Sequence, residues 1–204
     1  GITFTDSSII GVEADLSLPV NSVDWSNVMI ELFEQVSATE IRMAAVLLEV
    51  YASQPSLFFY QQPIVNGAHG QYYGIEESHV NLGDFYRLRL VRQGGAIQMY
   101  RGDTLMATYV AQGELIGFSI LAGNYGASSM YATVDNVRVL RDYDGDGLSN
   151  SVETNTGVYV SPSDTGTNPL LADSSGDGFT DGEVVSAGLS PVVDYSSLLA
   201  IVRN

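Results

Sequence analysis

The chain has 204 residues, with 24 acidic residues against eight basic ones, and it contains no cysteine. A net charge of −16 repels phosphate backbones and anionic lipid headgroups, which excludes nucleic-acid binding, and without cysteine neither disulfides nor thiolate metal sites can form. The most apolar stretch, residues 43–52, is interrupted by Glu49 and is far shorter than the roughly 20 residues that a membrane helix needs. We therefore expect a globular protein with no membrane insertion.

The first part of the chain has the residue pattern of β-strands. Apolar residues from Val12 to Leu18 alternate with polar ones, which is the period of a half-buried strand, and Val28 to Leu32 repeat the pattern. The run from Ile41 to Ala52 fits either a strand or a helix by periodicity alone. Its β-branched and aromatic content, and the strand-like runs around it, favour a long strand.

The same pattern continues toward residue 141. Tyr86, Leu88 and Leu90 alternate with arginines, which predicts that the guanidinium groups point outward. Further strands are expected at 97–100, 105–110, 115–121 and 130–140, separated by short turns. About ten strands without a convincing amphipathic helix predict an all-β fold, a β-sandwich or jelly roll.

The distribution of charge indicates a domain boundary near residue 141. Residues 1–141 carry 14 acidic and seven basic side chains, whereas residues 142–204 carry ten acidic side chains and one basic one, Arg203. The acidic residues of the second part are also clustered, and long apolar runs disappear. We predict a sandwich domain at 1–141, a small and mostly irregular region with short helical turns at 142–190, and a tail at 191–204.

A family resemblance supports the sandwich. The segment FYRLRLVRQGGAIQMYRGDTLMATY (85–109), followed by IGFSILAGN (116–124) and ATVDNVRVL (132–140), resembles the second half of concanavalin A-like lectin/glucanase sandwiches of the laminin G-like kind. Residues 10–80 fit only by strand pattern. Because this family includes lectins, adhesion modules and glycosidases, the resemblance implies a fold and leaves the activity open. Asp135 resembles an acid that holds structural calcium in some sugar-binding jelly rolls.

The strongest chemical signal is DYDGDGLSNSVE, residues 142–153. A 12-residue calcium loop supplies oxygen ligands from positions 1, 3, 5, 7, 9 and 12 and has glycine at position 6, which is Gly147 here. The predicted ligands are Asp142, Asp144, Asp146, the carbonyl of Leu148, Asn150 and Glu153. The alternative is a solvated acidic turn, since Asp-Gly pairs are common turn formers, but it does not explain the spacing of the acids.

A second loop, DSSGDGFTDGEV (173–184), follows 31 residues later. Its predicted ligands are Asp173, Ser175, Asp177, the carbonyl of Phe179, Asp181 and Glu183. Position 12 is Val184, so Glu183 stands one residue early. Either Glu183 reaches the ion through altered local geometry, or Asp164 or Asp194 supplies the missing oxygen, and we expect this loop to bind calcium more weakly than the first.

The two loops and the spacer TGTNPLLAD (165–173) resemble bacterial thrombospondin type 3 repeats over residues 142–190. This sequence departs from the family pattern at Asn168 and Ser175, where aspartate is usual. In that family calcium ions replace a hydrophobic core, so the resemblance implies that this region folds around bound calcium. Extracellular calcium modules bind at about 10⁻⁴ to 10⁻³ M, which favours a secreted or cell-surface location.

The sequence contains no recognisable catalytic motif. Lectin-like glucanases carry an E-x-D-x-x-E string on one strand, and neither Glu31 with Glu34 nor Glu76 with Glu77 has that spacing. Trp25, the only tryptophan, is expected in the core, with a sugar-stacking role as the alternative.

We therefore expect a non-catalytic fragment of a secreted or cell-surface bacterial protein. In this interpretation the sandwich binds a glycan or an extracellular protein, and the calcium repeats form a rigid spacer. The alternative is a polysaccharide-degrading enzyme, a hydrolase or lyase of the same fold, with an unusual site.

Overall fold

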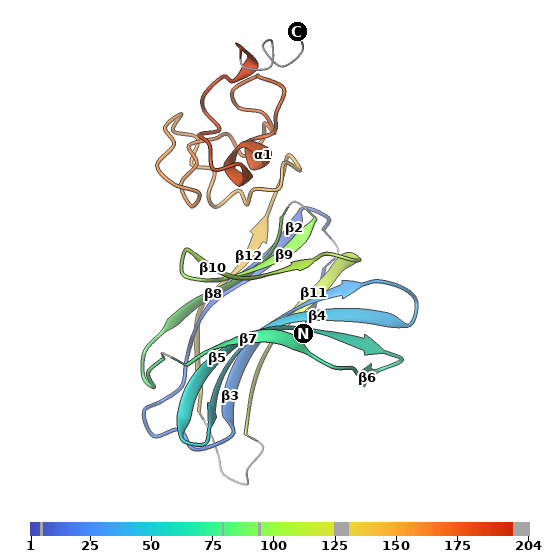
Figure 1. The fold of residues 1–204 in the computed structure, drawn as a ribbon, viewed down its shortest axis with the longest axis vertical. Coiled ribbons are helices and arrows are strands. Elements are labelled where there is room, and N and C mark those ends of the chain that lie inside the picture. Colours follow the sequence, from blue (N-terminus) through green and yellow to red (C-terminus); the bar gives the residue numbers. More distant parts are fainter. Residues whose placement is uncertain (5, 79, 94, 125–130, 198–204) are drawn as a thin grey trace. The chain divides into compact units, whose positions relative to one another are not determined.

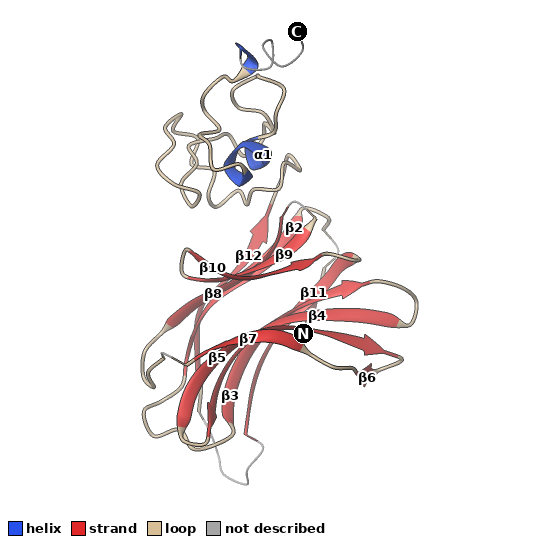
Figure 2. Cartoon of the chain, in the orientation of Figure 1, coloured by secondary structure: helices blue, strands red, loops and turns tan. Residues whose placement is uncertain are grey.

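A computed structural model describes residues 1–4, 6–78, 80–93, 95–124 and 131–197. Within these residues the chain forms twelve strands and one short helix, α1 (Asp181–Ser186). Figure 2 shows that the strands belong to the part of the chain before residue 142 and that loops dominate after it. The all-β prediction is thereby confirmed.

The larger sheet has seven strands in the described residues, with the path β1-β11-β3-β4-β5-β6 and with β7 also paired to β5. Its strands are β1 (Ile2–Thr3), β3 (Ser26–Gln35), β4 (Glu40–Tyr51), β5 (Gln54–Val65), β6 (Ala68–His69), β7 (Tyr73–Glu77) and β11 (Glu114–Asn124), of which all but β1 are labelled in Figure 1. All of its described pairings are antiparallel, and β4 pairs with β5 from Glu40↔Val65 to Tyr51↔Gln54.

The smaller sheet has five strands in the order β10-β9-β8-β2-β12. These are β2 (Ile9–Ser17), β8 (Tyr86–Gln93), β9 (Ala96–Arg101), β10 (Thr104–Val110) and β12 (Thr133–Arg141). On β8, Leu88 is fully buried while Arg87 is exposed, as the alternation in the sequence predicts. Two such faces pack against each other because each sheet has one apolar face to remove from water.

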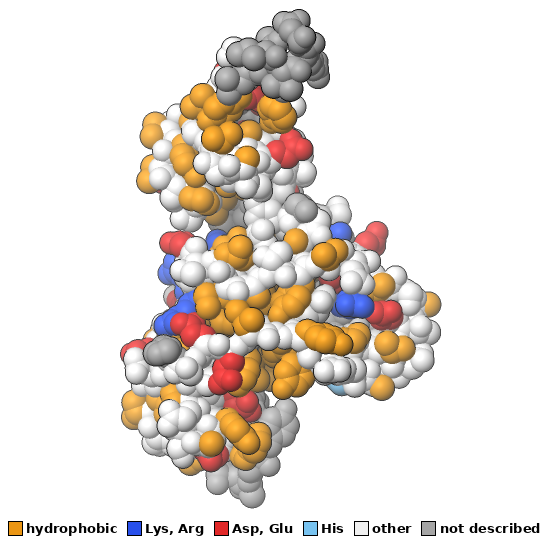
Figure 3. Space-filling model, in the orientation of Figure 1, with side chains coloured by type: hydrophobic (Ala, Val, Ile, Leu, Met, Phe, Trp, Pro, Cys, Tyr) orange, Lys and Arg blue, Asp and Glu red, His pale blue; other side chains and the backbone are white. Residues whose placement is uncertain are grey.

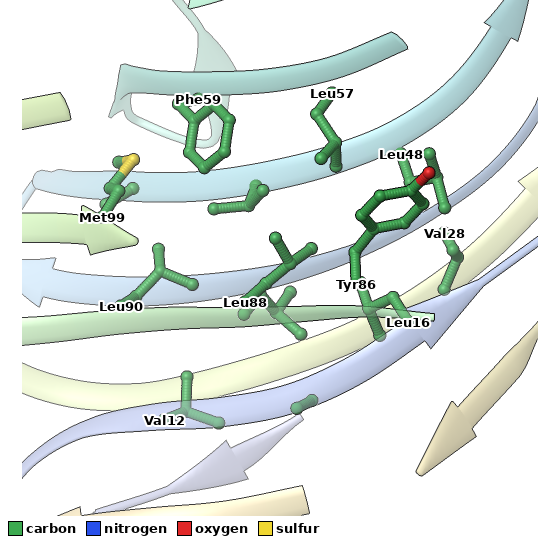
Figure 4. Close-up of a cluster of buried hydrophobic side chains, with 14 of the residues drawn as sticks. Val12, Leu16, Val28, Leu48, Leu57, Phe59, Tyr86, Leu88, Leu90 and Met99 are labelled. Carbon is green, nitrogen blue, oxygen red and sulfur yellow. The ribbon is translucent and has the colours of Figure 1, made fainter. Parts of the chain in front are cut away.

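The core lies between the two sheets, and Figure 4 shows part of it. Val12, Leu16, Leu88 and Leu90 come from the smaller sheet, and Val28, Leu48, Leu57 and Phe59 come from the larger one. Each of these side chains is at most 1% exposed. Burial of a side chain of this size stabilises the fold by about 1.5–3 kcal/mol, so this layer supplies the main driving force for the sandwich.

The long apolar run is a strand, as its composition indicates. It forms β4, whose residues 44, 46, 48 and 50 face the core. Its hairpin partner β5 was not among the predicted strands, because Pro55 and the polar residues Gln61 and Gln62 interrupt the apolar pattern there. Pairing with β4 over twelve residues on one side and with β7 on the other fixes this strand.

The chain divides into two compact units. The first comprises residues 1–7 and 11–139, and the second comprises residues 8–10 and 140–204. The division into a sandwich domain at 1–141, a repeat region at 142–190 and a tail at 191–204 stays a prediction. In the described part of the chain no helix has the length and apolar character required to cross a membrane.

Helix α1 of the second unit begins at a capping box. The Thr180 side chain accepts a hydrogen bond from the N–H of Glu183, and the Glu183 carboxylate accepts one from the N–H of Thr180 at 2.9 Å. These two bonds satisfy backbone groups that a helix end leaves open, and they allow a six-residue helix to form within an otherwise irregular region.

Candidate functional site

The first acidic loop is wound around the side chain of Asp142. The two oxygens of this carboxylate accept hydrogen bonds from the N–H groups of Gly145, at 2.7 Å, and Gly147, at 2.9 Å. Gly147 has φ of 94°, a left-handed conformation that glycine adopts readily. The turn predicted at position 6 of the loop is therefore present.

Five carboxylates of the second unit gather into two overlapping groups. Asp142, Asp144 and Asp146 each place an oxygen within 4.8 Å of the others, and so do Asp146, Glu153 and Asp181. Asp146 belongs to both groups. We name these five residues the acidic centre.

Four of the five residues of the acidic centre are buried, and Asp144 is partly buried. Asp146 is 9% exposed, Glu153 is 4% exposed and Asp181 is 1% exposed. Oδ2 of Asp144 and Oε2 of Glu153 are buried without a hydrogen-bond partner among the described residues. A buried carboxylate oxygen without a donor carries a desolvation cost, which a proton, a water molecule or a cation offsets.

The electrostatics of the acidic centre reflect this crowding. Burial, followed by the charges of Asp146 and Asp144, raises the pKa of Glu153 to about 8. Burial and the charges of Asp144 and Asp142 raise the pKa of Asp146 to about 7. Burial also raises the pKa of Asp181 above its ordinary value. Without a cation, the folded unit therefore disfavours the ionised form of its central carboxylates at neutral pH.

The interior of the second unit is polar. Its buried hydrophobic side chains in the described residues are Leu140, Leu148, Val152 and Val184. Its buried polar side chains are more numerous: Asp142, Asp146, Ser149, Glu153, Thr165, Thr167, Asp177 and Asp181. Carboxylate oxygens are the ligands that hard cations such as Ca²⁺ prefer, so the residues of the acidic centre fit a calcium ion.

The other two predicted ligands of the first loop lie close by. Oδ1 of Asn150 accepts a hydrogen bond from the N–H of Tyr143 at 2.9 Å, which braces the loop across its two ends. Leu148 is 2% exposed, and its N–H donates to Asp146 at 2.7 Å. The metal ligation predicted for Leu148 and Asn150 stays a prediction.

The second loop repeats the local geometry of the first. Oδ1 of Asp173 accepts from the N–H of Gly176 at 2.7 Å, and Oδ2 accepts from Gly178 at 2.8 Å, as in the first loop. Gly178 has the same φ of 94° as its counterpart. Desolvation acts to raise the pKa of Asp173, but hydrogen bonds from Gly178, Gly176 and Ser175 outweigh it and hold the pKa below the ordinary value.

The second loop does not gather its carboxylates as the first does. Asp181 belongs to the acidic centre and accepts hydrogen bonds from the N–H and hydroxyl of Ser174. Asp177 is buried but accepts from the N–H groups of Phe179 and Tyr195. Glu183 is exposed and takes part in the capping box of α1.

The two residues considered as alternative calcium ligands of the second loop, Asp164 and Asp194, accept hydrogen bonds from other residues of the second unit. Asp164 accepts a hydrogen bond from the hydroxyl of Thr154 at 2.6 Å. Asp194 accepts one from the N–H of Ser196 at 2.8 Å. Position 12 is Val184, which is 5% exposed, so a buried methyl-bearing side chain stands where the first loop has Glu153.

A second candidate site lies on the outer face of the seven-stranded sheet of the sandwich. It is a groove of about 580 Å³, within the size range of small-molecule sites. Its lining comes mainly from outward-facing residues of β4, β5 and the β7 region: Trp25, Leu47, Glu49, Tyr51, Phe58, Tyr60, Gln62, Tyr72, Gly74, Ile75 and Glu76. We name it the aromatic groove.

Two edge-to-face aromatic pairs line the aromatic groove. The ring centroids of Trp25 and Tyr51 are 4.8 Å apart, and those of Tyr60 and Tyr72 are 5.8 Å apart. Trp25 is 44% exposed, so the expectation that it lies in the core is wrong. It adopts a positive φ of 70° just before β3, which turns its side chain to the outer face beside β4.

The sequence contained a signal for this groove that the strand analysis did not use. Leu47, Glu49 and Tyr51 are alternate residues of β4, and Phe58 and Tyr60 are alternate residues of β5. Because residues of the same parity share one face of a sheet, aromatic residues at those positions indicate an aromatic outer surface once the pairing is known.

Asp135 does not join a carboxylate group in the described residues. Its Oδ1 accepts a hydrogen bond from the adjacent N–H of Asn136, and the metal-type groupings comprise only residues of the acidic centre. The acidic pair considered for catalysis is also separated. Glu31 accepts from the hydroxyl of Ser119 on the outer face, whereas Glu34 is 2% exposed and accepts from the N–H of Gln112.

Comparison with protein-family models gives no match, and comparison with curated proteins gives none either. Among solved structures, the homodimeric agglutinin CG-16 from chicken liver has a TM-score of 0.47 and 10% identity, covering 67% of this chain and 96% of that chain. A tetrameric galectin from the ball sponge Cinachyrella sp. has a TM-score of 0.47 and 11% identity, covering 68% and 96%. Congerin II with lactose and MES has a TM-score of 0.45 and 15% identity, covering 65% and 92%. Because these TM-scores lie below 0.5, the fold assignment rests on strand order and register.

Proposed function

We propose that the second unit binds calcium and that the sandwich binds a glycan in the aromatic groove. The chain is then a non-catalytic, calcium-stabilised carbohydrate-binding fragment. The two activities rest on different residues, so each has its own supporting observation and its own experiment.

The calcium proposal is carried by Glu153. Glu153 is only 4% exposed. Its Oε1 accepts a hydrogen bond from the hydroxyl of Thr167, and its Oε2 has no hydrogen-bond donor among the described residues. Oxygens of Asp146 and Asp181 lie within 4.8 Å of it. A divalent cation among these oxygens offsets both the desolvation cost and the repulsion between like charges.

The resemblance of residues 142–190 to thrombospondin type 3 repeats supports the same proposal. In such repeats the ions hold the chain in one conformation, so the second unit serves as a stiff spacer for the sandwich. The expected affinity of about 10⁻⁴ to 10⁻³ M suits an extracellular or cell-surface location, where calcium is available at that concentration.

The test is isothermal titration of chelator-treated protein with calcium, in parallel with melting curves. We expect heat of binding, and a gain of about 1.4 kcal/mol in stability at ten times the dissociation constant for one ion. Asp146→Asn is expected to weaken binding at least about tenfold, because one charged ligand is lost. Asp103→Asn, an exposed acid in the sandwich, is the matched control. If calcium addition gives no heat of binding and no rise in melting temperature, the proposal is refuted.

The glycan proposal is carried by the arrangement of aromatic and polar groups in the aromatic groove. Tyr51 is 54% exposed and Tyr72 is 64% exposed, so their rings offer apolar surface to a ligand. Gln62, Glu49 and Glu76 lie in the same lining and supply hydrogen-bonding groups. Aromatic surface beside a few fixed polar groups is the composition of a small-molecule binding site, and it matches the alternating apolar faces and hydroxyl edges of a sugar.

The test is an array of immobilised glycans probed with the intact chain. We expect retention of at least one class of glycan, and loss of retention in the Tyr72→Ala variant. Tyr131→Ala is the matched control, because Tyr131 is 78% exposed and lies outside the groove lining. If the array retains nothing, or if both variants behave alike, the sandwich does not bind glycans in this groove.

The alternative of a polysaccharide-degrading enzyme is favoured by one observation, the presence of Glu49 and Glu76 in a single groove. Glycosidases place two carboxyl groups about 5–10 Å apart, where they couple electrostatically. Burial raises the pKa of Glu49 above its ordinary value. The test is an assay for reducing sugar released from a polysaccharide. If the intact chain releases sugar and Glu49→Gln does not, the enzyme proposal replaces the binding proposal.

A further inference from the structure

The floor of the aromatic groove holds an uncompensated carboxylate. Glu49 projects from β4 to the outer face and is half-buried. Among the described residues no group donates a hydrogen bond to it and no arginine forms an ion pair with it; the ion pairs of the described chain involve Glu40, Asp15, Glu77 and Glu13. Burial raises the pKa of Glu49, and nothing acts in the opposite direction.

The remaining lining of the groove is complementary to positive charge. It contains a second carboxylate, Glu76, which is exposed, and it contains no arginine or histidine. The chain as a whole has no lysine and a net charge of −16. The aromatic rings add to this preference, since the faces of tryptophan and tyrosine attract cations within about 6 Å.

We propose that the ligand of the aromatic groove is an amine-bearing saccharide, whose protonated amino group is held by Glu49 against the surrounding aromatic rings. This inference rests on the proposed glycan-binding function and specifies the class of glycan. A cationic group replaces the water that Glu49 loses on burial, and the charge-assisted hydrogen bond strengthens because the groove is partly shielded from solvent.

The same arrangement excludes acidic saccharides. A uronic acid, sulfate or sialic acid in the groove would place an anion beside Glu49 and Glu76 with no basic side chain in the lining to balance it. Neutral saccharides are able to stack on Tyr51 and Tyr72 but leave Glu49 without a counter-charge. The expected order of affinity is therefore amine-bearing, then neutral, then acidic.

The experiment compares three oligosaccharides of equal length and linkage on the intact chain: a β-1,4 glucosamine oligomer, its fully N-acetylated form and the corresponding glucose oligomer. Isothermal titration in mildly acidic buffer, where the sugar amines are protonated, measures each affinity. We expect the glucosamine oligomer to bind about tenfold more tightly than the other two, and this preference to shrink as salt rises.

Variants separate the contribution of charge from that of stacking. Glu49→Gln is expected to bring the three affinities to within about twofold of one another while the affinity for the neutral oligomers stays unchanged. Tyr72→Ala is expected to weaken all three. Glu114→Gln, an exposed acid on β11 outside the groove, is the matched control. Melting curves show that each variant is folded.

The possible failures are distinguishable. If neutral oligomers bind as tightly as the amine-bearing one, or if Glu49→Gln leaves the preference intact, this inference is wrong and the glycan proposal stands. If none of these saccharides nor any member of the glycan array binds, both are wrong. Binding of a non-sugar amine, such as a trimethylammonium compound, without binding of any saccharide also refutes both and leaves a cation-binding groove of another kind.

Discussion

Oδ2 of Asp146, in the first acidic loop, accepts a hydrogen bond from the N–H of Gly182, in helix α1, at 3.0 Å and across 36 residues of sequence. The adjacent residue Asp181 contributes a carboxylate to the same acidic centre. The first turn of α1 therefore lies against the first loop, and residues of both acidic loops meet in the acidic centre. The absence of a Cβ at Gly182 permits this close approach.

Replacement of Gly182 by alanine tests this junction. A Cβ at this position would lie 2.2 Å from the backbone oxygen of Asp146, so the backbone must shift. We expect Gly182→Ala to weaken calcium binding about tenfold, because Asp181 moves away from the other ligands. Ser186→Ala, at an exposed position of the same helix, is the control, and equal calcium affinities in titrations of the two variants contradict the shared centre.

The stability of the second unit without calcium is expected to decrease as pH rises. Folded-state pKa values of about 7 for Asp146 and about 8 for Glu153 lie above those of the unfolded chain, so the folded state binds more protons between about pH 4 and pH 8. Stability is then fully present below pH 4 and falls progressively until both groups are ionised. Amide hydrogen exchange at Gly182 in chelator, measured at several pH values and corrected for intrinsic rates, reports this change.

Calcium is expected to reverse that dependence. Ion binding requires ionised carboxylates, so affinity rises through the same pH range. Saturating calcium should therefore protect the Gly182 amide more at pH 8 than at pH 5, which is the opposite of the trend in chelator. The same trend under both conditions indicates that these carboxylates do not hold the ion.

Replacement of Glu153 by glutamine is expected to have opposite effects with and without calcium. The amide has nearly the same shape but no charge, which removes the repulsion from Asp146 and Asp144. The metal-free unit should gain stability above pH 8, whereas calcium affinity should fall at least about tenfold. Melting and calcium titration of Glu153→Gln beside Asp103→Asn check both signs, and a loss of stability in chelator contradicts the electrostatic account.

The sandwich and the first acidic loop were predictable because their signals are local. The alternation of apolar and polar residues in 12–18 and 86–90 defines the faces of two strands. The spacing from Asp142 to Glu153 defines a loop whose own backbone N–H groups donate hydrogen bonds to the Asp142 carboxylate. The calcium ligation predicted for both loops stays a prediction, which the experiments above test.

The features that the sequence did not predict depend on contacts between distant residues. The aromatic groove needs the register of β4 with β5 and of β5 with β7, which places Leu47 beside Phe58 and Phe58 beside Glu76. The spacing in the sequence assigns Asp181 to the second loop. In the structure it lies beside Asp146 and Glu153, because α1 packs against the first loop. Trp25 lies on the outer face because of a single positive φ, for which the sequence carries no signal.

We expect the stability of the sandwich core to be independent of calcium. Phe59 is fully buried between the sheets, and Phe59→Ala is expected to cost about 3–5 kcal/mol, measured by urea denaturation in chelator and in calcium alike. Phe85→Ala is the matched control, because Phe85 is 55% exposed. A cost that appears only with calcium contradicts the view that this core is independent of the ion.

The second unit also exposes hydrophobic side chains at its surface. Hydrophobic side chains reach its surface in Figure 3, and the exposed set includes Val158, Val160, Leu170 and Leu171. Since these side chains do not contribute to the interior, the few buried hydrophobic residues, the buried polar groups and the short helix hold the unit together. The cap of α1 then becomes a sensitive position.

Thr180→Ala removes the side chain that accepts the N–H of Glu183 at the start of α1. Loss of such a cap costs about 1 kcal/mol, and here it also frees the first turn, which carries Asp181 and Gly182. We expect weaker calcium binding although no ligand is lost, with recovery in Thr180→Ser, because serine restores the same acceptor. Calcium titration of the two variants decides the point: if alanine and serine give equal affinities, the capping box does not position Asp181, and the acidic centre is held by its own loop alone.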